Sequence, residues 1–417
     1  MPSKSCSDWR LRRKSHAKIH IHNSQSAEQY FANLAIKVTN HATQKQLAAA
    51  VLQAHSSGCI SRDAQAMLLS KLHEGVTAAS LWPMLVMVEC GVPCSLIASE
   101  TQVSDHTCKY DDDDVPVLQH LPSAKALFEQ HVLPSRPVIL RNAVGSETTR
   151  LADPSFLRAR CGHRRVPVKS FALDDADGRP NFVADPTTRM PLPAFLDALE
   201  EAECRGTRCP YYLGKVPLRD ELPELAAALD AATAAVAPAT GSEPSAARGS
   251  TPLPPMLYEK CFGPMVSQGA YTYYGCARNV TATHFDNSEN LMLCLCGTKR
   301  LWLYPPKDTP YLSPAADRER TSRADAPPFR RWHELPPELQ ATFRGLAYAS
   351  PVEVHLQAGD ALYLPACWWH CVEGSRDRNM ILSYWYGLHP RKPAQDANGP
   401  AVKWEAWVDR WPAPDGC

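Results

Sequence analysis

The chain has 417 residues, and its 44 lysines and arginines are balanced by 44 aspartates and glutamates, so the formal net charge is zero. This balance does not favour nucleic acid or an anionic membrane as a general partner. The longest apolar run, from Leu81 to about Val88, contains Pro83 and is far shorter than the roughly 20 residues that cross a bilayer. We therefore expect a soluble protein with no membrane partner.

The amino-terminal quarter is predicted to be helical behind a basic arm. Residues 1–25 are polar and basic without a hydrophobic pattern, which favours a disordered arm, with a targeting address as the alternative. Residues 26–112 are predicted to form a helical region and linker, because apolar residues recur at helical spacing. They are Tyr30, Phe31, Leu34 and Val38, then Ala64, Met67, Leu68 and Leu72. The acidic run Asp111–Asp114 is predicted to mark the boundary of the next domain.

Residues 113–392 are predicted to form the catalytic domain. A helix is expected at Leu192–Glu203, and an Ala, Pro, Ser and Gly-rich stretch at about 230–256 is predicted to be a flexible insert. Short β-prone segments punctuated by Gly and Pro favour a barrel or sandwich, so the fold class is α+β and mainly β. They are 136–141, 165–169, 271–274, 279–286, 290–296, 299–304, 352–356, 361–364, 370–373 and 380–386.

Residues 393–417 are predicted to form a carboxy-terminal helix or tail. Trp404, Trp407, Val408 and Trp411 recur at helical spacing, so this segment is expected to cover the barrel or to pair two subunits in a homodimer. The chain has fifteen scattered cysteines, several in apolar segments, and no apolar amino-terminal signal segment. We interpret them as reduced thiols of an intracellular protein, cytoplasmic and/or nuclear.

Two histidines and one carboxylate are the candidate metal ligands. On an extended strand, residues two apart point to the same face, so His284 and Asp286 can hold one ion from a single strand. His370 is expected on another strand. Two imidazoles and one carboxylate on one face of an ion are typical of non-heme Fe(II) oxygenases, which keep the opposite positions open. This pattern predicts Fe(II) as the metal and O2 as a reactant.

Two segments around these ligands resemble the core of JmjC-domain 2-oxoglutarate oxygenases. They are Asn287–Pro306 and Gly359–His370, the second of which places the distal histidine 86 residues after the first. The resemblance covers about residues 116–390, and is greatest to the small JmjC hydroxylases that include factor inhibiting HIF. It implies a double-stranded β-helix, the cupin jelly roll, with flanking helices. It also implies catalysis by His284, Asp286 and His370, with 2-oxoglutarate as cosubstrate, yielding succinate and carbon dioxide.

The same resemblance implies the residues that bind 2-oxoglutarate. Lys299, 15 residues after the first histidine, matches a lysine that pairs with its distal carboxylate, and Thr281 matches a threonine that binds the same group. Strand alternation alone would place Ala282 rather than Thr281 beside the ligands, so the role of Thr281 requires a local bend. Asn290 and Tyr212 match polar residues near the cosubstrate. Ser383 is also predicted to bind the cosubstrate. It stands where factor inhibiting HIF, an asparaginyl hydroxylase, has asparagine, so the resemblance does not imply the same asparaginyl substrate for this chain.

The predicted function is hydroxylation of a protein side chain. The alternatives are histone lysine demethylation, RNA hydroxylation, and a non-catalytic binding module of the cupin type, which would need a broken metal site. An RNA partner is suggested by a basic loop between the metal-bearing segments that contains Arg318, Arg320, Arg323, Arg330 and Arg331. Four aromatic residues, Trp368, Trp369, Trp385 and Tyr386, are expected to pack the barrel rather than to contact substrate.

Overall fold

The structure is a computed structural model that describes residues 51–52, 62–73, 84, 114–170, 187–207, 209–234, 258, 261–262, 265–276, 278–314 and 323–386. By its contacts the chain divides into two compact units. The first consists of Met1–Ser104, Pro306–Ala326 and Arg331–Ala349; the second consists of Asp105–Pro305, Pro327–Arg330 and Ser350–Cys417.

The described part of the first unit is helical. It contains α4 (Arg62–His73), α14 (Pro337–Thr342) and the 3-10 helices η4 (Pro306–Tyr311), η5 (Trp332–Glu334) and η6 (Arg344–Tyr348). Three of the four residues that predicted the second helix, Met67, Leu68 and Leu72, are buried in α4, which confirms that helix. The helix predicted from Tyr30 to Val38 and the basic arm lie outside the described residues.

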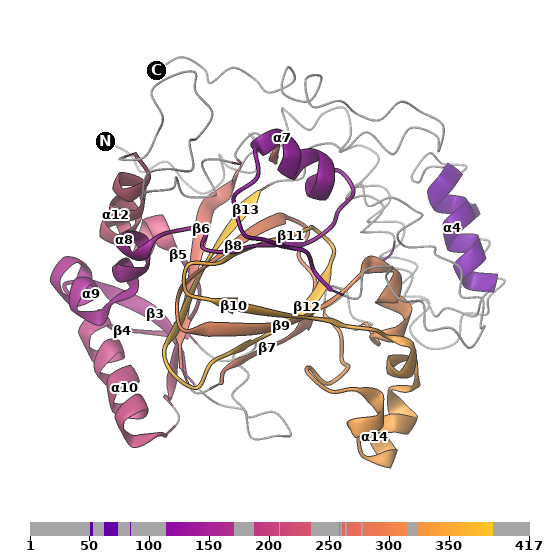
Figure 1. Cartoon of the computed structure of the whole chain (residues 1–417). Helices are drawn as coiled ribbons and strands as arrows, with labels where there is room; N and C mark the ends of the chain where they lie inside the picture. Colours follow the sequence, from indigo (N-terminus) through magenta and orange to yellow (C-terminus); the bar gives the residue numbers. More distant parts are fainter. Residues whose placement is uncertain are drawn as a thin grey trace, which may run out of the picture. The chain divides into compact units, whose positions relative to one another are not determined.

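The second unit is built from two β-sheets (Figure 1). The larger sheet has nine strands in the order β1-β2-β11-β8-β13-β6-β5-β3-β4, and the smaller has four in the order β10-β9-β12-β7. The strands of the larger sheet are β1 (Val117–Leu118), β2 (Val138–Leu140), β3 (Arg165–Ser170), β4 (Thr187–Pro191), β5 (Tyr211–Pro217), β6 (Met265–Gly275), β8 (Glu289–Cys296), β11 (Ala361–Leu364) and β13 (Asn379–Tyr386). Those of the smaller are β7 (Val280–His284), β9 (Thr298–Tyr304), β10 (Val352–Gln357) and β12 (Trp369–Gly374).

All pairings in the two sheets are antiparallel except that of β1 with β2. Strands adjacent in the chain often lie in different sheets, as β7, β8 and β9 do, so the chain crosses repeatedly between the two layers. This is the arrangement of a jelly-roll sandwich. The predicted fold class is confirmed, together with every strand predicted from the sequence to within a few residues at its ends, except that Tyr271–Tyr274 is the carboxy-terminal part of the longer β6.

The central strand β8 shows why this unit has two cores. Leu291, Leu293 and Leu295 point to one side and join the core beneath the helices, whereas Met292 and Cys294 point into the space between the sheets. All but the last residue of β8 are buried. A strand covered on both faces reads as a continuous apolar run rather than as an alternating one.

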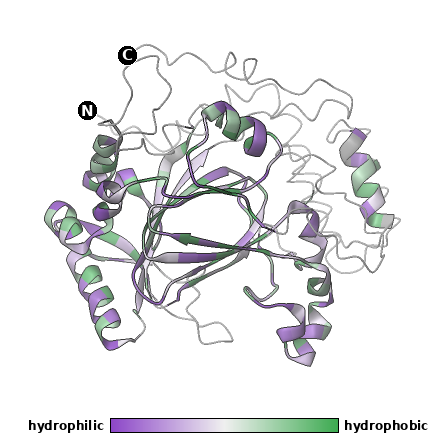
Figure 2. Cartoon of the chain, in the orientation of Figure 1, coloured by the Kyte–Doolittle hydropathy of each residue, from purple (hydrophilic) through white to green (hydrophobic). Residues whose placement is uncertain are grey.

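The helices of this unit pack against the larger sheet (Figure 1). They are α7 (Ala124–Leu127), which continues as the π-helical turn η1 (Phe128–Val132), then α8 (Ser146–Thr149), the 3-10 turn η2 (Arg150–Ala152), α9 (Pro154–Cys161), α10 (Leu192–Arg205), α11 (Leu218–Glu221) and α12 (Pro223–Ala234). Helix α10, predicted from the sequence, buries Leu192, Phe195, Leu196 and Leu199 on one face, and Figure 2 shows green and purple residues along its length. No helix among the described residues is long and apolar enough to span a membrane.

Two parts of this unit differ from the sequence-based expectation. Strands β1, β4 and β5 were not predicted. Strand β5 contains Gly214 and ends at Pro217, and both residue types are depleted in strands. Helix α12 extends to Ala234, so the first residues of the predicted insert are helical, whereas residues 235–257 lie outside the described part. The carboxy-terminal tryptophans also lie outside it, and the predicted domain limits, including those of the tail at 393–417, stay predictions.

A buried carboxylate fixes the turn before β11. Asp360 is fully buried, receives hydrogen bonds from the backbone N–H groups of Gln357 (2.9 Å) and Asn142 (3.2 Å), and pairs with the guanidinium of Arg141. It therefore joins the β10–β11 turn to the residues that follow β2. Since β11 pairs with β2 in the larger sheet, this carboxylate fixes the start of β11 relative to its neighbouring strand.

The Asp360→Ala variant is expected to lose about 3 kcal/mol of unfolding free energy, because two backbone donors and a partly buried guanidinium lose their acceptor. Denaturant unfolding measures this loss. The matched control is Asp377→Ala, at an exposed position, which is expected to stay within about 0.5 kcal/mol of the parent protein. Equal midpoints for the two variants would contradict this role of Asp360.

Candidate metal centre

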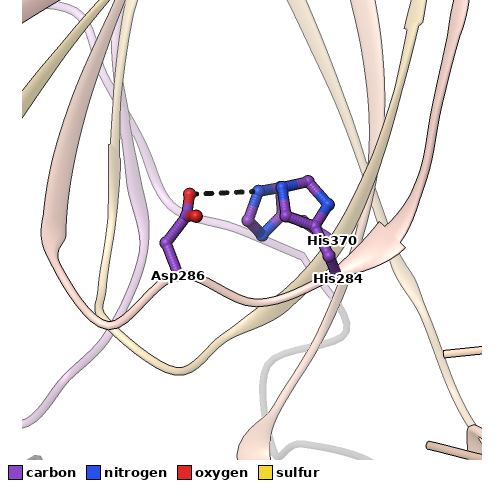
Figure 3. Close-up of side chains that lie close together, drawn as sticks. All are labelled: His284, Asp286 and His370. Carbon is purple, nitrogen blue, oxygen red and sulfur yellow. Dashed lines mark ion pairs between the residues drawn. The ribbon is translucent and has the colours of Figure 1, made fainter. Parts of the chain in front are cut away.

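His284, Asp286 and His370 lie together between the sheets (Figure 3). One ligand atom from each lies within 4.8 Å of the others, and His370 Nε2 is 3.8 Å from Asp286 Oδ2. The imidazole centroids are 4.2 Å apart, because His284 and His370 are direct cross-strand partners on β7 and β12. A small movement of the side chains brings all three onto one ion.

Backbone hydrogen bonds hold both imidazoles in the form that binds a metal. His284 Nδ1 lies 2.9 Å from the carbonyl oxygen of Ala282, and His370 Nδ1 lies 3.0 Å from that of Trp368. A carbonyl oxygen only accepts, so each Nδ1 carries the proton and each Nε2 keeps a free lone pair. Burial and the neighbouring His284 lower the pKa of His370 to about 4, against the opposing effect of Asp286. His370 is therefore neutral at physiological pH.

Asp286 does not lie on the same strand as His284, contrary to the expectation from strand alternation. Strand β7 ends at His284, and Asp286 is two residues beyond it. Its backbone carbonyl accepts a hydrogen bond of 2.8 Å from the N–H of Cys367, in the turn before β12. This bond ties the loop after β7 to the residues that precede His370, so the carboxylate reaches the histidines from a loop held on two sides.

A β-bulge places Thr281 on the same side as the ligands. His284 pairs with His370, but Thr281 pairs with Val372, so three steps along β7 match two steps along β12. The extra residue reverses the alternation that would have pointed Ala282 inward. The structure thus contains the local bend that a role for Thr281 requires.

The metal ligands open into a pocket with an empty volume of about 430 Å³. It is lined by Tyr212, Tyr273, Thr281, His284, Asp286, Asn290, Met292, Lys299, His370, Val372, Ile381, Ser383 and Trp385. All eight site residues predicted from the sequence are in this set, so residues from β5, β7, β8, β9, β12 and β13 meet in one place. Their individual roles as ligands or cosubstrate contacts stay predictions.

Lys299 brings a buried positive charge into this pocket. Its side chain extends from β9 and the residue is only 2% exposed. Among the described residues no carboxylate forms an ion pair with Lys299, and desolvation lowers the pKa of its ammonium to about 8. The cationic form of Lys299 therefore gains from an anion that enters the pocket.

Other polar atoms in the pocket also lack protein partners. Both polar side-chain atoms of Asn290, the hydroxyl of Ser383 and the indole nitrogen of Trp385 are buried and form no hydrogen bond within the described part of the chain. Tyr212 differs, because its hydroxyl interacts with the Asn279 side chain, and burial raises its pKa. Buried polar groups are normally paired, so this cluster of unpaired atoms fits a polar ligand.

Five residues that line the pocket were not predicted from the sequence. Trp368 and Trp369 are buried in the barrel as expected, but Trp385 lines the pocket. The signal was present in β13, where alternate residues Ile381, Ser383 and Trp385 face the same side. The other three missed residues are Tyr273, Met292 and Val372. Of these, Met292 is the cross-strand partner of Ser383.

The donor set fits a divalent first-row metal. Two neutral imidazoles and one carboxylate are ligands of intermediate hardness, suited to iron, and three protein ligands leave further positions to other ligands. Beside them, Lys299 and the unpaired polar atoms fit an anionic molecule that carries several oxygen atoms. The site therefore combines a metal with a polar, negatively charged ligand.

The part of the chain that contains this site resembles a known protein family. The family profile for the cupin-like domain matches residues 124–392. A human bifunctional peptidase and (3S)-lysyl hydroxylase, JMJD7, is 27% identical over 297 residues, which is 66% of this chain and 84% of that protein. The lysine-specific demethylase JMJ30 of Arabidopsis thaliana is 24% identical over 63% of this chain and 53% of its own length. The tRNA wybutosine-synthesizing protein 5 of Gallus gallus is 32% identical over 22% of this chain and 25% of its own length.

These relatives have different substrates in their names, but they share one domain. The profile match covers more than half of the chain and contains all the residues of the pocket. Together with the jelly roll and the His-Asp-His cluster, it identifies the chain as a member of the cupin-like family of JmjC-type oxygenases.

Proposed function

We propose that this protein is an Fe(II)- and 2-oxoglutarate-dependent dioxygenase that hydroxylates a protein side chain. The observation that carries the proposal is the pocket itself, in which a His-Asp-His cluster lies beside a buried lysine without a carboxylate partner among the described residues. JmjC-type oxygenases use Fe(II) together with 2-oxoglutarate.

His284, Asp286 and His370 would hold the iron. The two backbone carbonyls that accept from the Nδ1 atoms keep each Nε2 directed at the ion, and the hydrogen bond between Asp286 and Cys367 restrains the carboxylate. Such restraint of the rings by outer hydrogen bonds fixes ligand orientation and favours metal binding. The Asp286 carboxylate would neutralise one of the two positive charges of the ion. The remaining positive charge would attract an anionic cosubstrate.

Lys299 would bind the distal carboxylate of 2-oxoglutarate, with the hydroxyl of Thr281 donating a second hydrogen bond. Asn290 and Ser383 offer unpaired polar atoms to the same molecule or to water around it. Met292, Val372 and Ile381 form an apolar part of the wall, which limits the access of water. With Lys299 at one end of 2-oxoglutarate and the metal ligands at the other, the pocket would orient the keto end of the cosubstrate toward the histidines.

With both groups bound, the centre would supply oxidative decarboxylation of 2-oxoglutarate by O2 to succinate and carbon dioxide, in which one oxygen atom of O2 enters succinate and the other is inserted into a C–H bond of the substrate. The protein orients the reactants and excludes water. A protein substrate is favoured because the alignment with the lysyl hydroxylase covers 66% of this chain, whereas that with the tRNA-acting relative covers 22%. Demethylation is the alternative, since the same oxygen insertion at an N-methyl group releases formaldehyde.

Replacement of a metal ligand is expected to remove metal binding. His284→Ala or Asp286→Ala leaves two donors, and we expect at least a tenfold loss of Mn(II) affinity, used as a redox-stable substitute for Fe(II) and measured by calorimetry. His355→Ala is the matched control, because His355 is exposed on β10 and paired with Glu353. Equal Mn(II) affinity in the His284→Ala and His355→Ala proteins would contradict the assignment.

Turnover tests the reaction. The wild-type protein with Fe(II), ascorbate and 2-oxoglutarate is expected to release succinate, and the Asp286→Ala protein is expected to release none above background. Mass spectrometry of captured protein substrates should show an increase of about 16 Da, the mass of one oxygen atom. Formaldehyde without a mass increase would indicate demethylation, and succinate release that is unchanged in the Asp286→Ala protein would exclude catalysis at this centre.

The affinity for 2-oxoglutarate is expected to fall at alkaline pH. Lys299 is protonated below its pKa of about 8 and neutral above it, so the dissociation constant should be constant below pH 7 and rise up to about tenfold per pH unit above pH 8. Lys299→Met should weaken binding by roughly 10- to 100-fold at pH 7 and remove this pH dependence. A wild-type affinity that is constant up to pH 9.5 would contradict a charged role for Lys299.

A further inference from the structure

Lys215 has an unusual backbone conformation beside the pocket. Its φ angle is +56°, in the left-handed region that residues with a side chain seldom adopt. It lies on β5 at a register shift, because Leu213 pairs with Tyr274 but Val216 pairs with Thr272. Bulges next to active sites redirect a side chain, and backbone strain persists where the surrounding structure enforces it. The bulge therefore determines where the Lys215 ammonium lies.

The ammonium lies over an aromatic side chain of the pocket. Lys215 Nζ is 4.5 Å from the centroid of the Trp385 ring, within the range of a cation–π interaction. Lys215 is exposed, whereas Trp385 is only 9% exposed and lines the pocket. Tyr271 packs against the same indole, with ring centroids 4.7 Å apart. The exposed ammonium of Lys215 thus contacts Trp385, a tryptophan that also lines the pocket.

Two further features show that this cluster still has binding capacity. No ion pair joins Lys215 to a carboxylate of the described residues; Asp220 acts electrostatically on Tyr271 but forms no ion pair with Lys215. The indole N–H of Trp385 is buried in the pocket and has no acceptor among the described residues. Of the described residues that line the pocket, Asp286 alone has a carboxylate, which the proposed function assigns to the metal.

We propose that Lys215 and Trp385 determine substrate specificity by binding an acidic peptide. Lys215 would pair with an aspartate or glutamate side chain that flanks the hydroxylated residue, and the indole N–H of Trp385 would donate to a carbonyl oxygen of the same peptide. This inference rests on the proposed function, because it places the peptide beside the metal centre. It extends that function by giving the charge class of the substrate.

A cationic or nucleic acid substrate fits the cluster less well. The ammonium of Lys215 already occupies a face of the indole, so a lysine or arginine of a substrate would meet like charge there rather than an open aromatic ring. Stacking of a base on Trp385 is hindered for the same reason, since single-stranded RNA needs exposed aromatic faces along a continuous basic groove. Lys215 is exposed and forms no ion pair with a carboxylate of the described residues, so it can pair with one carboxylate of a substrate.

Peptide libraries test this inference. Three pools of nonapeptides have a random central residue and flanks built from Gly, Ala and Ser together with one further pair of residues. The pair is Asp and Glu in the acidic pool, Lys and Arg in the basic pool, and Asn and Gln in the neutral pool. A random RNA 12-mer is the fourth pool. Each pool is assayed for stimulated succinate release and for a gain of oxygen mass. We expect the wild-type protein to use the acidic pool at least about tenfold better than the basic pool.

Two variants isolate the charge. Lys215→Asn removes the charge and retains a residue that tolerates a positive φ, so the preference should fall to near unity. Lys215→Glu should favour the basic pool. The matched control is Lys125→Glu, since Lys125 is a half-exposed residue on α7; it should keep the wild-type preference. Thermal unfolding of each variant verifies that it is folded.

The possible outcomes separate this inference from the proposed function. Equal use of acidic and basic pools by the wild-type protein, stimulation by none of the peptide pools, stimulation by RNA alone, or an acidic preference that persists in Lys215→Glu would each overturn the inference. Stimulation by RNA alone would also refute the protein substrate of the proposed function, whereas the other results leave that function standing if the wild-type protein still releases succinate in the presence of Fe(II). Absence of succinate release under all conditions would instead refute the proposed function.

Discussion

The pairing of β7 with β12 is the constraint on which the candidate site depends. It places His284 directly opposite His370, and its one-residue bulge turns Thr281 toward the same side. Strand β12 also pairs with β9, which carries Lys299. The two histidines and the charge beside them are therefore positioned by one four-stranded sheet, and the larger sheet supplies the opposite wall of the pocket.

The pocket is unfavourable to charge until it is filled. Desolvation lowers the pKa of Lys299 to about 8 and that of His370 to about 4, so burial weakens the charged form of each group. The side-chain polar atoms of Asn290 and Ser383 are buried without a hydrogen bond among the described residues, and this costs free energy because they have lost their hydration. A divalent ion and a dianionic ligand remove these costs together. Sites that retain buried unpaired groups are commonly binding sites, because the ligand replaces the lost hydration.

Sequence reasoning predicted the parts of the site that depend on local pattern. The strands with apolar runs were found because their composition does not depend on distant contacts. Lys299 was found through the family resemblance, because it lies at the distance from His284 at which related oxygenases have a lysine. The bulge in β7 was anticipated only as a requirement for Thr281, because register depends on the partner strand. Asp286 was placed on a strand that ends before it, since the bond from Cys367 that holds its loop is made between distant segments. Lys215 was missed because β5 itself was not recognised.

The most direct test of the account is a crystal structure of the protein grown anaerobically with Mn(II) and an unreactive analogue of 2-oxoglutarate. The account predicts an anomalous peak bound by His284, Asp286 and His370, with the distal carboxylate of the analogue within hydrogen-bond distance of Lys299 Nζ. A metal bound elsewhere would contradict it. So would an analogue whose distal carboxylate lies on Lys215 while Lys299 stays unpaired.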